Sequence, residues 1–165
     1  MISKERMLAV LNGECPDQVP TGEMGVDYPI TEHVLGHPTF YRGKYREKSA
    51  VWAGRRDEVV ASQKNDLVEL TQKLEWDFMP VFLTYRAGQN YAPAVFLDET
   101  TWKDTYGRIW KYSTVTEDIL CVESPRLDET AIDILRQPFV PDESELELVR
   151  HVVKACGDSH FIVGR

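Results

Sequence analysis

Two segments of the chain place apolar residues at the three- and four-residue spacing of an amphipathic helix. Residues 3–12 do so with Ser3 as the expected cap, and residues 55–75 show the clearest pattern of the chain. The apolar positions are Met7, Leu8 and Leu11 in the first segment and Val60, Leu67, Leu70 and Leu74 in the second. Residues at this spacing return to one side of a helix. We therefore predict two helices with these faces packed inward, and with charged residues such as Asp66 facing water.

Other segments show the patterns of strands. Nearly unbroken apolar runs at 78–83 and 161–163 predict strands buried on both faces, as in a parallel sheet covered by helices. Residues 98–123 alternate apolar and polar positions between turn residues, which is typical of an antiparallel meander with one face in water. Residues 19–25 predict a weaker first strand, because they contain proline and glycine. Residues 26–54 are expected to be irregular, with one short helix.

The order of these elements predicts a fold class. Asp142 and Glu145 form a capping-box pair before a further amphipathic helix, which precedes the last apolar run. Helix then strand, three times over, is typical of α/β folds. We predict the N-terminal part, about three βα units, of a TIM (β/α)8 barrel, with the antiparallel meander inserted after strand 2. Residues 1–165 would be a single partial domain that lacks the C-terminal half of the barrel; a small self-contained α+β domain is the alternative.

Charge and composition exclude several classes of protein. The net charge is −8, from 27 acidic and 19 basic residues, which disfavours binding to nucleic acids and to anionic membrane surfaces. No apolar run approaches the length of a membrane span, and the N-terminus lacks the pattern of a signal peptide. Cys15, Cys121 and Cys156 are an odd number at wide spacing, which fits unpaired thiols in a reducing compartment. We expect a cytoplasmic protein.

Three stretches resemble the uroporphyrinogen decarboxylase-like superfamily. Residues 5–20, ERMLAVLNGECPDQVP, resemble the family pattern E-R-x-L-x-A-L-x-G-E-x-P-D-R-V-P that precedes the first barrel strand. Residues 74–81, LEWDFMPV, resemble the start of its second strand, and residues 104–111, DTYGRIWK, resemble its D-E-W/F-G-x-x-W motif. The resemblance implies a (β/α)8 barrel, of which this chain covers about half or less.

The resemblance also implies two possible reactions. One branch transfers methyl groups between a small methylated substrate, a corrinoid protein and an acceptor, with zinc held by His and Cys on later strands. The true decarboxylase instead binds a polycarboxylate tetrapyrrole through arginines after the first strand. Here no arginine lies between Gln18 and Arg42, and Glu23 and Asp27 add negative charge. Methyl transfer is therefore favoured, with uroporphyrinogen decarboxylation as the alternative and a non-catalytic binding module as the third possibility; the chain alone is expected to be inactive.

Candidate site residues follow from where barrels place their chemistry, at the carboxyl ends of strands. Glu23 and Asp27 follow the first predicted strand and are our candidates for catalysis. Residues after the second strand are candidates for binding a small-molecule substrate, namely Tyr85, Arg86 and Asn90. His33 and His37 have the four-residue spacing of metal ligands on a helix, but the glycine and proline beside His37 interrupt that helix, so no metal is expected there.

Overall fold

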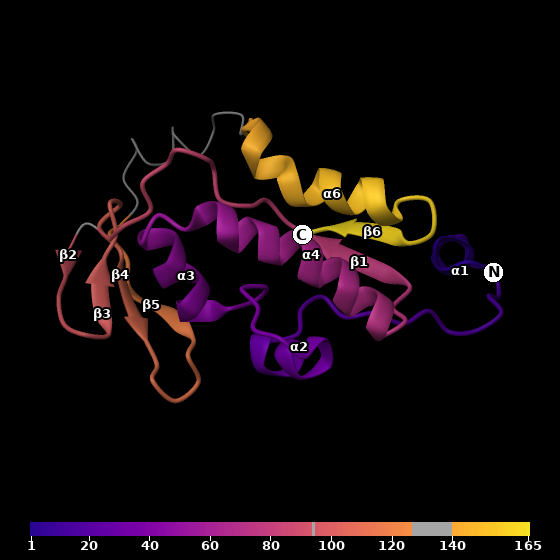
Figure 1. Cartoon of the computed structure of the whole chain (residues 1–165), viewed down its shortest axis with the longest axis horizontal. Helices are drawn as coiled ribbons and strands as arrows, with labels where there is room; N and C mark the ends of the chain where they lie inside the picture. Colours follow the sequence, from indigo (N-terminus) through magenta and orange to yellow (C-terminus); the bar gives the residue numbers. More distant parts are fainter. Residues whose placement is uncertain (94, 127–139) are drawn as a thin grey trace.

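The computed structural model of the chain describes residues 1–93, 95–126 and 140–165. It is a mixed α/β structure in which the strands form a two-stranded parallel sheet and a four-stranded antiparallel sheet. Figure 1 shows the antiparallel sheet at one end of an elongated molecule and the N-terminal helix at the other, with the parallel strands and their helices between them. None of the described helices is both long and apolar enough to cross a membrane.

The parallel sheet confirms the two strands predicted from apolar runs. Strand β1 (Phe78–Val81) pairs with β6 (Phe161–Gly164), so that Phe78 lies opposite Phe161. The crossover into β6 is made by helix α6 (Glu147–Cys156), which packs against β1 and against helix α4 (Arg56–Lys73). Since β1 is buried along most of its length, a continuous apolar run was the correct signal for it.

The core lies where α4 and α6 meet β1. Its fully buried side chains are Leu67 and Leu70 of α4, Met79 of β1, and Leu148 and Val152 of α6. Each such aliphatic side chain contributes about 1.5–3 kcal/mol to folding when removed from water. The periodicity in α4 correctly predicted its two buried leucines, whereas the predicted Leu74 is exposed because it follows the last turn.

One predicted charged position of α4 is buried instead. Asp66 is only 5 % exposed, and its carboxylate accepts hydrogen bonds from the hydroxyls of Thr39 and Ser62. Both hydroxyls donate to the same carboxylate oxygen, which water would otherwise solvate. The expectation that Asp66 faces water was therefore wrong, because Thr39, from a loop before α4, covers this side of the helix together with Ser62 of α4 itself.

Residues 19–25 do not form the predicted strand, although they run beside β1. The Asp77 amide donates to the Thr21 carbonyl at 2.6 Å, and the Thr21 amide donates to the Asp77 carboxylate at 2.7 Å. Gly22 packs so closely on the Phe78 ring that a Cβ there would overlap it. Pro20 has no N–H to donate to a ladder, which helps explain why this segment is extended without regular pairing.

Helix α1 (Ser3–Leu11) ends one residue before the predicted bound and has neither the predicted cap nor the predicted buried face. Ile2 is the N-cap residue, and its amide donates to the Glu5 carboxylate at 3.0 Å. The buried residues are Arg6 and Ala9, while Leu8 and Leu11 are exposed. The helix is held by the charge of Arg6 rather than by an apolar stripe, and apolar spacing does not show this.

Two helices occupy the segment for which one was expected. They are α2 (Tyr28–Leu35) and α3 (Lys44–Trp52). Arg42, in the turn between them, has φ +56°, and Lys44, the first residue of α3, has φ +52°. Non-glycine residues adopt this left-handed region at an energetic cost, and such positions gather at functional sites.

The antiparallel sheet confirms the predicted meander. Its strands lie in chain order, as β2 (Val95–Phe96), β3 (Thr101–Lys103), β4 (Ile109–Tyr112) and β5 (Ile119–Glu123). Trp102 of β3 is buried against Trp52 of α3, with ring centroids 5.0 Å apart in a T-shaped arrangement. This aromatic contact joins the meander to the helices.

The predicted capping box is also confirmed. Asp142 caps the 3-10 turn η1 (Glu143–Leu146), which leads directly into α6. The Asp142 carboxylate accepts from the Ser144 amide at 2.9 Å, and the Asp142 amide donates to Glu145 at 2.7 Å. Within α6, Leu148 is fully buried against the core, whereas Val153 is 51 % exposed.

Candidate functional site

A pocket of about 610 Å³ lies at the carboxyl ends of the parallel strands. Phe82 directly follows β1 and Arg165 directly follows β6, and both line the pocket. The remaining lining residues come from the N-cap of α2, the turn before α3, the first turn of α3, and the β4–β5 turn with the start of β5, and are Asp27, Arg42, Lys44, Glu47, Asp118 and Ile119. Parallel α/β sheets place their ligands at this end of the strands.

Lys44 sits between two carboxylates of this pocket. Its ammonium lies 2.8 Å from Asp27 and 3.0 Å from Asp118, and these hydrogen bonds raise the pKa of Lys44. Lys44 therefore stays charged and joins the loop after residue 25 to the turn before β5. The negative charge of Asp27 is balanced by Lys44 and by Arg42, which lies 4.0 Å away.

Two guanidinium groups converge on Gly25. A Cβ at Gly25 would lie 3.0 Å from Arg42 Nε and 3.3 Å from Arg165 Nη1, so a side chain there would crowd both groups. Arg165 also donates to the Met24 carbonyl at 3.1 Å. The planar fork of a guanidinium matches a carboxylate or phosphate, which makes this corner of the pocket suited to an anion.

Glu47 supplies a carboxyl group with an altered pKa. It accepts a hydrogen bond from the Tyr85 hydroxyl at 2.9 Å and from the Gln63 amide at 3.1 Å. Burial raises the pKa of Glu47, and burial together with the adjacent Glu47 raises the pKa of Tyr85. A carboxyl group in such surroundings holds its proton more readily than one in water, as a general acid requires.

The structure separates the two predicted catalytic residues. Asp27 lines the pocket, whereas Glu23 is exposed outside it and accepts a hydrogen bond from the neighbouring Met24 amide at 2.9 Å. The lining contains three cationic and three carboxylate side chains, so the charge of Asp27 is balanced within the pocket, and Glu23 is not part of the lining.

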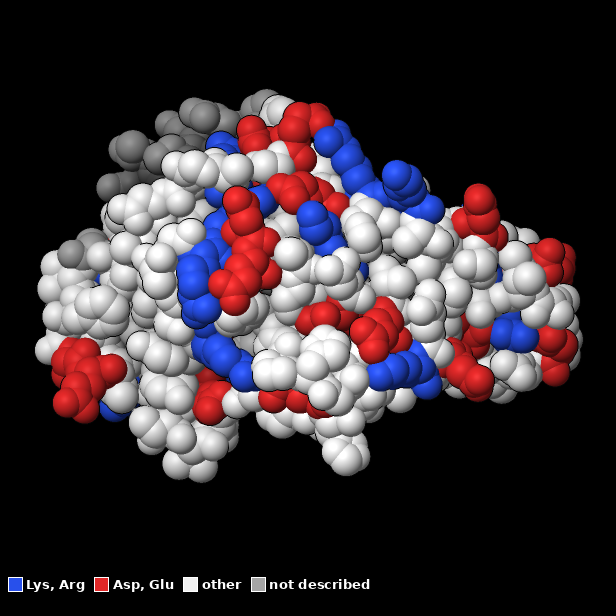
Figure 2. Space-filling model, in the orientation of Figure 1, with Lys and Arg blue, Asp and Glu red and all other residues white. Residues whose placement is uncertain are grey.

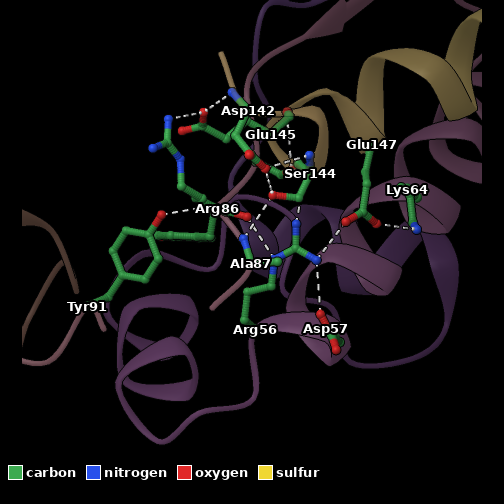
Figure 3. A network of polar contacts seen from close by, with 12 residues as sticks. Arg56, Asp57, Lys64, Arg86, Ala87, Tyr91, Asp142, Ser144, Glu145 and Glu147 are labelled. Atoms are coloured by element: carbon green, nitrogen blue, oxygen red, sulfur yellow. Dashed lines mark hydrogen bonds and ion pairs between the residues drawn. The ribbon is translucent and has the colours of Figure 1, made fainter. Parts of the chain in front are cut away.

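The three predicted substrate-binding residues occupy different places. Tyr85 contacts Glu47, but it does not itself line the 610 Å³ pocket. Asn90 lines a second pocket and accepts from the Ala92 amide at 2.9 Å. Arg86 is bound to Glu145 at 2.9 Å, and its amide donates to the Tyr91 hydroxyl at 2.7 Å (Figure 3).

The loop after β1 is fixed by a polar network that Figure 3 shows between α4 and the start of α6. At its centre, Arg56 donates to the Tyr85 carbonyl at 2.7 Å and to the Ser144 carbonyl at 2.9 Å. Arg56 also lies 2.7 Å from Glu147, which Lys64 contacts at 3.1 Å. Arg86 belongs to this network, so its contacts are those of a residue that positions the loop.

The three cationic side chains that line the pocket were not predicted from the sequence. Arg42, Lys44 and Arg165 were not distinguished from the other basic residues, which on the face seen in Figure 2 lie beside acidic ones. A signal was present in the order Arg42-Gly43-Lys44, where a glycine between two charges suggests a tight turn. That signal does not reveal which strand ends the turn will approach.

No family model, curated protein or solved structure matches the chain. The described ranges contain no group of three or more His, Cys, Asp and Glu side chains placed to hold a metal ion. His37, one of the histidines considered for a metal, lies 3.5 Å from Glu69.

Proposed function

We propose that this chain forms part of the active-site face of a barrel enzyme of the uroporphyrinogen decarboxylase-like superfamily. The pocket at the carboxyl ends of β1 and β6 would bind a small substrate that carries an anionic group. The observation that carries this proposal is the convergence of Arg42 and Arg165 on Gly25.

The order of the strands supports a partial barrel. Thr21 lies beside Asp77 at one end of β1, and Gly25 lies beside Arg165 at the other end, so residues 21–25 run in the same direction as β1. Residues 21–25, β1 and β6 thus follow one another along the chain and share one direction, with helices between them. A (β/α)8 barrel has this order.

For the reaction, we propose methyl transfer from a small methylated carboxylate, with a corrinoid protein as partner. Arg42 and Arg165 would hold the carboxylate, and Asp27 and Glu47 would orient the remainder of the substrate. Cationic side chains are needed for such a substrate and would not favour a methylated amine. The residue motifs at 5–20, 74–81 and 104–111 support the family. The zinc that the family implies has no ligand group among the described residues, so no role in zinc binding is given to them.

Decarboxylation of a carboxylated tetrapyrrole is the second candidate. The cationic lining favours decarboxylation more than the sequence alone did. The family binds its carboxylates with arginines directly after the first strand, and in this chain Arg42 and Arg165 would take that part. Glu47, with its raised pKa, could then deliver a proton to the carbon that loses carbon dioxide.

Calorimetric titration of the purified protein tests the binding step. Small carboxylates with and without an N-methyl group are compared with their neutral amides. We expect the carboxylates to bind and the R42M and R165M variants each to weaken binding about tenfold, since a charge-assisted contact is lost. The R150M variant is the matched control, because Arg150 is exposed and pairs with Glu143 outside the pocket.

Turnover by a complete barrel that contains this chain separates the two reactions, since the chain alone is expected to be inactive. For methyl transfer, we expect the substrate to lose its methyl group in the presence of a corrinoid protein and a thiol, as monitored by proton NMR. For decarboxylation, we expect uroporphyrinogen to lose carboxylate groups. Equal binding of carboxylate and amide, or equal effects of R42M and R150M, would refute the anion site. Tight carboxylate binding with neither turnover would favour a non-catalytic binding module.

A further inference from the structure

A second pocket, of about 340 Å³, lies between α3 and the antiparallel sheet. It has no part in the function proposed above. Much of its wall is aromatic, from Trp52 of α3, Tyr91 of the loop before β2, and Trp102, Tyr106 and Trp110 of the sheet and its turn. Trp52 and Trp102 meet edge to face, and Tyr91 lies at right angles to Tyr85, with centroids 5.0 Å apart in both pairs.

The acidic group of this pocket is already fully engaged. Asp104 accepts from Arg108 at 2.7 Å and from the Trp110 indole at 2.9 Å, and also from two backbone amides of its own turn. The Arg108 guanidinium lies 5.2 Å from the Tyr106 ring centroid and 5.1 Å from that of Trp110. Asp104, which accepts from four donors, is therefore not available to a cationic ligand, and its charge is balanced by the Arg108 guanidinium.

Lys48 is the remaining charged group of the lining. Its ammonium lies 5.6 Å from the Tyr85 ring centroid, and no carboxylate oxygen of the described chain lies within 4.0 Å of it. Burial lowers the pKa of Lys48, as expected for a cation without a close counter-ion. An aromatic wall with a cation in it disfavours quaternary ammonium ligands, which need a cage without competing positive charge.

We propose that this pocket binds a planar aromatic carboxylate, with its ring among Trp52, Tyr91 and Trp110 and its carboxylate at Lys48. The indole and phenol faces would supply the area that a flat ring buries, and the ammonium would supply the counter-ion. The amide side chains of Gln89 and Asn90 lie at the same pocket and offer further donors. The sequence predicted that Asn90 binds substrate. In this proposal it binds a ligand in the second pocket, whereas Asp27 lines the first.

The test is calorimetric titration of the purified protein with 2-naphthoate, 2-naphthamide, cyclohexanecarboxylate and tetramethylammonium. We expect 2-naphthoate to bind at least several-fold more tightly than each of the others, since only it has both the ring and the charge. The K48M variant should weaken 2-naphthoate binding about tenfold, and K48R should retain most of it. Y106A should weaken it several-fold, and Tyr106 is 74 % exposed, so its removal leaves the core intact.

Two controls keep the pocket distinct from the first one. K111M removes an exposed lysine of the same sheet that does not line this pocket, and it should leave binding unchanged. R42M should leave 2-naphthoate binding to this pocket unchanged, although it weakens binding of small carboxylates to the first pocket about tenfold. Circular dichroism and thermal unfolding verify that each variant is folded. The proposal is overturned if 2-naphthoate and 2-naphthamide bind equally, if millimolar 2-naphthoate does not bind, or if K48M and K111M have the same effect.

Discussion

The Arg6 guanidinium of α1 hydrogen bonds to the Asp77 carboxylate at the start of β1, across 71 residues of sequence. Arg6 also contacts Asp17 at 2.7 Å, and Asp77 accepts from the Thr21 amide at 2.7 Å. Arg6, Asp17 and Asp77 belong to the motifs that suggested the family, and they meet at the amino end of β1. In barrels this end serves stability rather than chemistry. The motifs thus have a structural explanation in this chain.

We predict that D77N lowers the free energy of unfolding by about 3 kcal/mol, because a buried acceptor of charged and backbone donors loses its charge. Asp77 is 1 % exposed. Chemical denaturation measures the change, and D158N, at an exposed position, should change stability by less than about 0.5 kcal/mol. A D77N effect no larger than that of D158N would contradict the structural role.

The same variant should show a characteristic pH dependence. Burial would raise the pKa of Asp77, but the hydrogen bonds from Thr21 and Arg6 outweigh it, so the pKa is lowered. This stabilisation is therefore complete above the pKa of the unfolded chain, about 4, and is lost as the pH falls through the folded pKa. The difference between wild type and D77N should shrink from pH 5 to pH 2, measured by denaturation at each pH.

Glu47 should produce the opposite dependence. Because burial raises its pKa, the folded chain binds this proton more tightly than the unfolded chain, and stability falls as the pH rises through the range between the two pKa values. E47Q keeps an oxygen that can accept from Tyr85 but cannot ionise. We expect E47Q to gain stability relative to wild type as the pH increases from 4 to 8. A difference that stays constant over this range would refute the raised pKa.

Arg56 should matter far more than its neighbour Arg55. Arg56 donates to two backbone carbonyls and contacts Glu147. Arg55 is exposed, pairs with the exposed Glu58 and lies 5.5 Å from the Phe40 ring centroid. We predict a loss of about 2–3 kcal/mol for R56M and less than about 0.5 kcal/mol for R55M, measured by denaturation. Similar losses for the two variants would mean that the network in Figure 3 does not hold the loop.

The three thiols should differ in reactivity toward an aromatic disulfide reagent. Cys15 and Cys121 are exposed, while Cys156 is buried in the core and burial raises its pKa. Since the thiolate is the reacting form, two thiols per chain should react rapidly and the third only slowly in the native state. Denaturant should make all three equally fast. Three rapid thiols without denaturant would contradict the packing of α6.

The local elements were largely predictable. The long helix, the two parallel strands, the meander and the capping box at Asp142 follow from patterns within a few residues of each other. The segment 19–25 and the helices α2 and α3 were not predicted correctly, since their conformation depends on contacts with distant parts of the chain. The burial of Arg6 and Asp66 was missed for a related reason: each has a hydrogen-bond partner in another segment, Asp77 for Arg6 and Thr39 for Asp66.

The sequence by itself determined the long helix α4, the two parallel strands and the meander, their α/β order, and the motifs that contain Arg6 and Asp77. Only the tertiary structure decided which charges share a pocket. Asp27 was predicted from its place after the first predicted strand. Arg42, Lys44 and Arg165 line the same pocket, but they come from the turn before α3, the start of α3 and the end of β6. Hydrophobic periodicity depends on the burial of one face and can be read locally, whereas an electrostatic site is the sum of side chains that chain folding brings together.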